Sequence, residues 1–306
     1  MAAGMPADRI LCPESPGEAV FLEALRSLRP DLCVTAAYGN YLPSRFLAIP
    51  PCGTLNIHPS LLPAYRGAAP VQRALQDGLA ITGVSLLYTV RAMDAGPILA
   101  QKKVPIDPEV QAPQLLEALF EQGTQLLLDN LELVWAGMAP LASQPQDEAR
   151  ATHAPKLARE EAALDFRLPA LALHNQVRAF AGWPGSFATF ALLPATEGCD
   201  GPSSSSGGSS SGGSSSSDSE TLELKVLHTR VVPLSESPWA SSSCDGGGAD
   251  AHAVSASKAG LYVRCSDGSA LQLLEVQPPG KRAMGAQDLV NGLKGRSLRW
   301  LPAHHA

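Results

Sequence analysis

Residues 54–63 read TLNIHPSLLP, a short apolar run that breaks into a loop punctuated by prolines. The run Thr54–Ile57 predicts a strand, and the loop after it extends to Gly67. Because side chains alternate along a strand, Asn56 and His58 are expected on the same side of its carboxyl end. An amide and an imidazole are therefore predicted to converge on one small group.

Helical and strand-like patterns alternate on both sides of this segment, each identified from its apolar spacing and its flanking prolines. The predicted helices are 18–28, 70–76 and 113–135, and the predicted strands are 32–37 and 83–90. This order indicates an α/β fold with an open, mostly parallel, doubly wound sheet. Ligands of such sheets gather at the carboxyl ends of the strands, where the loop after residue 57 lies.

The second half of the chain has a different pattern. We expect a first domain at 1–140, a Pro- and Ala-rich linker at 141–168 and a second domain at 169–306. After a helix at 170–180, the strand-like segments of this second domain are 187–192, 222–232, 261–265 and 270–276. Tracts rich in Gly and Ser near 194–220 and 236–258 cannot bury enough apolar surface to offset their ordering entropy, so disordered loops are predicted there.

The bulk composition excludes several classes of protein for this chain. A chain of 306 residues, 45% of them hydrophobic, can bury a sizeable core. Its formal net charge of −6 argues against a protein that coats nucleic acid through a positive net charge. Any contact with RNA must therefore be confined to a local basic surface. The six cysteines form no CxxC pair, and no zinc-site spacing is present, so no metal is expected. No apolar run is long enough to predict a membrane span.

A second polar motif, Met93-Asp94-Ala95-Gly96, follows the strand at 83–90. Taken singly, a histidine beside proline is more often structural than catalytic, and an aspartate before Ala-Gly shapes many turns. In combination, Asn56, His58 and Asp94 fit the transfer of a formyl group to an amine. The amide and the imidazole can stabilise charge on the formyl oxygen, and the carboxylate can accept the proton of the amine.

The whole stretch resembles the folate-dependent formyltransferases, whose signature is an Asn-x-His-x-Ser-Leu-Leu-Pro loop, a following Arg-Gly and a downstream Asp-x-Gly. Here Arg66-Gly67 and Asp94-Ala95-Gly96 stand in that order. The resemblance implies that Asn56, His58 and Asp94 are catalytic and that 10-formyltetrahydrofolate is the co-substrate. It assigns the folate pocket to Ser60, Leu61, Leu62, Pro63, Met93, Ala95 and Gly96.

The second half resembles the carboxyl-terminal domain of the formyltransferases that act on methionyl-tRNA. Three motifs carry this resemblance: THAPKL at 152–157, WPG at 183–185 and QPPGKRAM at 277–284. It implies a small β-barrel (OB-like) domain and methionyl-initiator tRNA as the partner that carries the amine. The terminal stretch holds one acid, Asp288, against the basic residues Lys281, Arg282, Lys294, Arg296 and Arg299, which predicts a local surface for tRNA phosphates.

The chain departs from the family at its beginning, where the family's opening strand and Gly-Thr-Pro loop are not visible. We expect an amino-terminally truncated catalytic domain, from either a gene model or an isoform that starts late. The first residues resemble neither a secretory signal nor a transit peptide. Because formylation serves organellar translation in eukaryotes, a mitochondrial or plastid protein is expected, and we expect it to be a monomer.

Two alternatives remain open. One is another folate formyl chemistry: formylation of a ribonucleotide amine or a sugar nucleotide, or hydrolysis of formylfolate. The other is an inactive truncated paralogue that only binds RNA.

Overall fold

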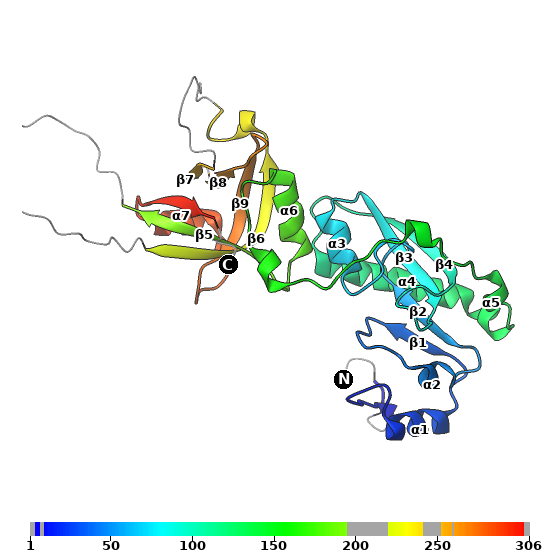
Figure 1. Cartoon of the computed structure of the whole chain (residues 1–306). Helices are drawn as coiled ribbons and strands as arrows, with labels where there is room; N and C mark the ends of the chain where they lie inside the picture. The colour runs from blue at the N-terminus through cyan, green and yellow to red at the C-terminus, as the bar shows by residue number, and fades with distance from the viewer. Residues whose placement is uncertain (1–3, 7–8, 195–219, 241–251, 259, 303–306) are drawn as a thin grey trace, which may run out of the picture. The chain divides into compact units, whose positions relative to one another are not determined.

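The computed structural model describes residues 4–6, 9–194, 220–240, 252–258 and 260–302. Two compact units divide the chain, Met1–Leu157 and Ala158–Ala306 (Figure 1). Their boundary falls inside the expected linker 141–168. Most of the two tracts predicted as disordered lies outside the described residues. The end of the second tract is ordered, because strand β7 (Val254–Ser257) pairs there with its neighbour.

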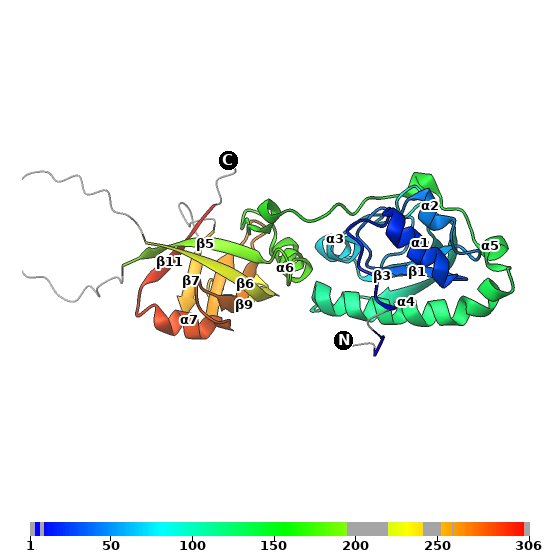
Figure 2. The same cartoon turned by 90° about the horizontal axis from the view of Figure 1, so that it is seen from below.

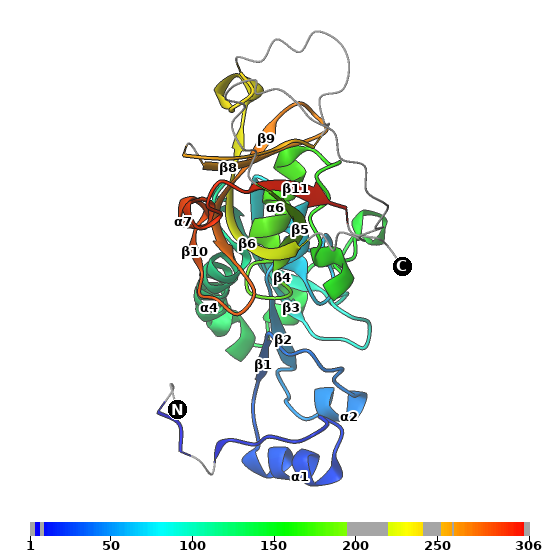
Figure 3. The same cartoon turned by 90° about the vertical axis from the view of Figure 1, so that its left-hand side faces the viewer.

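The first unit contains a four-stranded sheet whose strands follow chain order (Figure 3): β1 (Cys33–Ala36), β2 (Thr54–His58), β3 (Ile81–Tyr88) and β4 (Ile98–Pro105). This confirms the α/β class. The predicted parallel arrangement applies to β1 and β2, whereas β2–β3 and β3–β4 are antiparallel. Residues 89–97 join β3 to β4. A parallel pair needs a crossover of about a dozen residues or more, so this short connection favours a hairpin.

In the part of this unit that the structure describes, five α-helices accompany the sheet: α1 (Ala19–Leu28), α2 (Ser44–Leu47), α3 (Pro70–Gln76), α4 (Ala112–Trp135) and α5 (Ala139–Ala142). The long α4 runs along the sheet (Figure 2) and contacts β2, β3 and β4. Its Gly123 lies directly against the strands, where a methyl group would overlap Ile57 and Val84 side-chain atoms. Ile57 belongs to the core between helix and sheet, so its strand neighbours Asn56 and His58 face the other way.

Over its described residues, the second unit is a seven-stranded antiparallel sheet with two α-helices, α6 (Ala170–Ala179) and α7 (Ala286–Gly292). The other strands are β5 (Ser186–Leu193), β6 (Thr221–Val232), β8 (Gly260–Arg264), β9 (Ala270–Gln277), β10 (Met284–Gly285) and β11 (Ser297–Leu301). The two end strands, β11 and β7, contact one another, so the sheet is nearly closed. The predicted β-barrel-like domain is confirmed.

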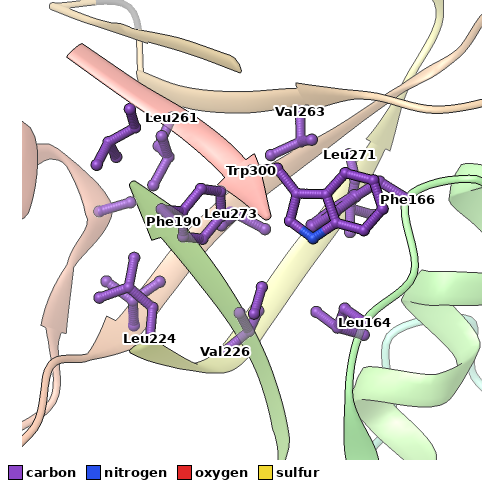
Figure 4. Packing of buried hydrophobic residues seen from close by; sticks show 14 of the residues in the cluster. Leu164, Phe166, Phe190, Leu224, Val226, Leu261, Val263, Leu271, Leu273 and Trp300 are labelled. Carbon is purple, nitrogen blue, oxygen red and sulfur yellow. The ribbon is translucent and has the colours of Figure 1, made fainter. Parts of the chain in front are cut away.

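The interior of this second unit is apolar and aromatic (Figure 4). The ring of Phe166 meets the edge of Trp300 at a centroid distance of 5.4 Å, in the geometry that aromatic pairs prefer. Phe190 and Leu224 are fully buried beside them. Over the described residues, the helices are all too short or too polar to cross a bilayer.

Candidate active site

A cavity of about 510 Å³ opens in the first unit around the carboxyl ends of β1 and β2. Asn56, His58 and Asp94 all line it, so the three side chains that the sequence singles out meet around one space. The other walls include Thr35, Tyr38, Tyr41, Gly67, Leu116 and Phe120. A cavity of this size falls in the range of small-molecule binding sites. In the part of the chain that the structure describes, no cluster of three metal-ligating side chains occurs.

The imidazole of His58 is buried, with 4% of the residue exposed, and both of its nitrogens have defined neighbours. Nε2 lies 2.9 Å from the backbone carbonyl oxygen of Tyr65. Because a carbonyl only accepts hydrogen bonds, Nε2 must carry a proton and donate it. The other nitrogen, Nδ1, lies 3.7 Å from Oδ2 of Asp94. The Tyr65 carbonyl therefore fixes which nitrogen of the ring faces the carboxylate.

The side-chain amide of Asn56 is oriented by Thr35, its register partner on the parallel strand β1. The Thr35 hydroxyl donates to Oδ1 of Asn56 at 2.9 Å. This leaves Nδ2 facing Oδ1 of Asp94 at 3.4 Å. Sequence reasoning missed Thr35. Its signal was a single hydroxyl in the otherwise apolar run 32–37, which lies beside Asn56 once the two strands pair.

Asp94 stands between the other two side chains and is itself tightly held. Its Oδ2 accepts a hydrogen bond from the backbone N–H of Gly67 at 2.8 Å. Its backbone has φ of 51°, in the left-handed region that residues with a Cβ rarely adopt. Its backbone carbonyl, and that of Gly96, accept hydrogen bonds from Nε2 of Gln146 at 2.6 and 2.8 Å.

A buried arginine supports this arrangement from outside the cavity. Arg66 is 5% exposed and forms a bidentate pair with Glu148, with two N–O distances of 2.8 Å. It also donates two hydrogen bonds to Oε1 of Gln146. The hydrogen bond from Arg66 lowers the pKa of Glu148 and raises that of Arg66. Gln146 and Glu148 lie in the segment expected as a linker, where no periodic signal marks them.

The residues assigned to the folate pocket divide into two groups. Met93 lines the cavity and is 67% exposed. The others, Ser60, Leu61, Leu62, Pro63, Ala95 and Gly96, are not among the residues that line it.

The Ser60–Pro63 turn is instead anchored to the sheet. Ser60 is fully buried, and the hydroxyl of Ser85 on β3 donates to its carbonyl oxygen at 2.6 Å. Leu61 packs where Gly83 has no side chain. Gly96 approaches the carbonyl of Tyr88 so closely that a Cβ would overlap it. These residues shape two loops beside the trio, the one that follows β2 and the one that carries Asp94.

In the second unit, the residues predicted to contact tRNA are exposed: Lys281, Arg282, Lys294, Arg296 and Arg299. Lys281 and Arg282 lie in the turn between β9 and β10, and Lys294 and Arg296 lie between α7 and β11. Nη1 of Arg296 donates to Glu220 at 2.8 Å, so an acid outside the terminal stretch balances part of this positive charge.

The chain matches known families over both units. Residues 8–131 match the formyl transferase family, and residues 156–294 match the formyl transferase C-terminal domain. A methionyl-tRNA formyltransferase of Chloroflexus aurantiacus is 37% identical over 299 residues, which cover 98% of this chain and 82% of that protein. One from Roseiflexus castenholzii is 43% identical over 191 residues, which cover 62% of this chain and 59% of that protein.

A solved structure supports the fold. HypX from Aquifex aeolicus, crystallised in complex with tetrahydrofolic acid, superposes with a TM-score of 0.54 at 17% identity. The superposition covers 89% of this chain and 40% of HypX. With identity and coverage of this extent to the bacterial relatives, the chain belongs to the methionyl-tRNA formyltransferase family.

Proposed function

We propose that this chain transfers the formyl group of 10-formyltetrahydrofolate to the amino group of methionyl-initiator tRNA. Family membership supports the formyl-transfer reaction and a folate donor. The observation that carries the proposal is the convergence of Asn56, His58 and Asp94 on one cavity, with the carboxylate of Asp94 between the amide and the imidazole.

The proposal gives each of the three side chains a task. As the amine attacks the formyl carbon, a C–N bond forms and negative charge develops on the formyl oxygen. Nδ2 of Asn56 donates to that oxygen, and Nδ1 of His58 donates to it when the ring is protonated. Asp94 stabilises the charged ring and takes the proton that the amine loses. The tetrahedral intermediate then breaks its bond to the folate nitrogen, which leaves with the proton that Asp94 took from the amine.

Three further points complete the proposal. The exposed Lys281, Arg282 and Lys294 support contact with tRNA phosphates by the second unit. We also propose a monomer as the working unit. We place the protein in the mitochondrion or plastid, where eukaryotic translation uses formylmethionine. Fractionation of cells with an antibody against the endogenous protein tests this location.

The direct test is to incubate the purified chain with 10-formyltetrahydrofolate and methionyl-initiator tRNA and to measure formylmethionyl-tRNA. Methionyl-elongator tRNA and an amino-sugar nucleotide serve as competing acceptors, and a reaction without an acceptor measures hydrolysis of the donor. Asp94→Asn is the inactive control. Preferential formylation of the initiator supports the proposal. Formylation of the sugar, or release of formate without an acceptor, would select another folate chemistry. RNA binding without any transfer would select the inactive paralogue.

A further inference from the structure

We propose that Gln146 is a positioning residue for formyl transfer, which holds the loop of Asp94 in its working conformation from outside the cavity. This inference rests on the proposed function. Both hydrogens of the Gln146 amide are used, one on the carbonyl of Asp94 and one on the carbonyl of Gly96. The side chain therefore bridges the loop at two points, one at the residue with φ of 51° and one two residues later.

The orientation of the Gln146 amide is set by Arg66. Nε and Nη2 of Arg66 lie 3.0 and 2.8 Å from Oε1 of Gln146. A guanidinium only donates hydrogen bonds, so the oxygen of the amide must face it and the NH₂ group must face the carbonyls. Arg66 is buried and carries a charge, which Glu148 neutralises through the bidentate pair. The direction of the amide is thus fixed by charged partners.

Three consecutive residues, 65 to 67, connect this support to the trio. The carbonyl of Tyr65 holds His58, the side chain of Arg66 holds Gln146, and the N–H of Gly67 holds the carboxylate of Asp94. A shift of Gln146 is therefore expected to move both the backbone and the carboxylate of Asp94 relative to His58. Because Gln146 does not line the cavity, it acts through Asp94 and not on the substrate.

The test is Gln146→Glu in the full chain. The new carboxylate can keep both hydrogen bonds from Arg66, but it opposes the two loop carbonyls with negative charge. Gln146→Met removes the two hydrogen bonds to the loop carbonyls, and those from Arg66, without adding charge. We expect both variants to lower kcat by about 100-fold, the scale of a misplacement of about 1 Å at a reacting group, with KM for folate and tRNA changed less than about threefold. Matched controls are Gln144→Glu and Gln144→Met, because Gln144 is exposed and pairs with Ile98 through its backbone.

A second readout does not depend on activity. Hydrogen exchange of the Gly67 amide reports whether the carboxylate of Asp94 is in place. We expect the exchange to become about tenfold faster in both Gln146 variants, as in Asp94→Ala, and to stay native in the Gln144 variants. The amide of Ala69, which donates to the carbonyl of Ala154, should keep its protection and serves as the internal control.

The outcomes separate the alternatives. Native Gly67 exchange and native kcat in the Gln146 variants would overturn the positioning role. Simultaneous loss of Ala69 protection would also overturn it, because Gln146 would then maintain the fold of the unit. If Gly67 exchange responds as expected while the wild-type chain transfers no formyl group to methionyl-tRNA, the proposed function fails and the positioning role of Gln146 on Asp94 stands.

Discussion

Replacement of Ser85 with alanine tests how the Ser60–Pro63 turn, which follows β2, is attached to the sheet. The Ser85 hydroxyl is fully used: it donates to the carbonyl of Ser60 and accepts from the N–H of Leu62 at 3.1 Å and from Nε2 of Gln101 at 2.7 Å. Alanine leaves the first two groups buried without these partners, while Gln101 keeps its bond to the carbonyl of Leu62. At about 1–3 kcal/mol for each unsatisfied buried group, and with partial relaxation, unfolding of the first unit should become easier by about 2–4 kcal/mol.

Native-state hydrogen exchange at the β3 amides of the full chain measures this change, because those amides report the opening of the first unit. Ser27→Ala is the control: its exposed hydroxyl bonds only to the carbonyl of Ala24, so its effect should stay within about 0.5 kcal/mol. A Ser85→Ala effect as small as that of the control would refute the reasoning, because it would show that water or a rearranged Gln101 satisfies the turn.

Three further predictions concern the site, the tRNA surface and a buried thiol. Asn56→Ala should lower kcat by about 100-fold through loss of an oxyanion donor, and unchanged turnover would refute that role. Replacing Lys281 and Arg282 with alanine should weaken initiator-tRNA binding and reduce its salt slope by roughly one unit per lost contact, with folate affinity as the folding control; an unchanged slope contradicts phosphate contacts there. Burial raises the pKa of Cys265 to about 12. Its contribution to stability should therefore hold below about pH 8.5 and be lost as pH rises towards the folded-state value. Iodoacetamide at pH 8 should label the exposed Cys12 and spare Cys265 until the chain unfolds, and equal labelling of the two native thiols would contradict this.

Sequence reasoning succeeded where local pattern and chemistry coincide. The helix predicted at 113–135 is α4, and the strand predicted at 54–57 is β2, because each has a strong apolar period. Strand β4 escaped prediction because its polar residues Gln101, Lys102 and Lys103 break the apolar run. Without β4, the hairpin that makes this part of the sheet antiparallel could not be foreseen.

The supporting residues of the site were beyond sequence reasoning for another reason. Gln146 and Glu148 make their contacts with residues about 50 to 80 positions earlier, through side-chain hydrogen bonds that leave no periodic trace. The Ser60–Pro63 turn was assigned to the folate pocket by motif. Its burial against β3 depends on Ser85 and Gly83, which only the paired strands bring beneath it.

Gly123 in the long helix α4 also matters for attempts to stabilise the protein by substitution. Glycine in a helix interior costs about 0.5–1 kcal/mol relative to alanine, so a search for stabilising substitutions by helix propensity would choose this position first. Yet the space that the missing methyl group leaves is occupied by Ile57, the residue between Asn56 and His58 on β2. The spacing between α4 and the sheet thus sets the position of β2, the strand that carries Asn56 and His58. A larger residue at 123 would favour the isolated helix, but its overlap with Ile57 would strain the core and displace the amide and the imidazole together, so helix propensity and core packing make opposite demands at a residue that does not line the cavity.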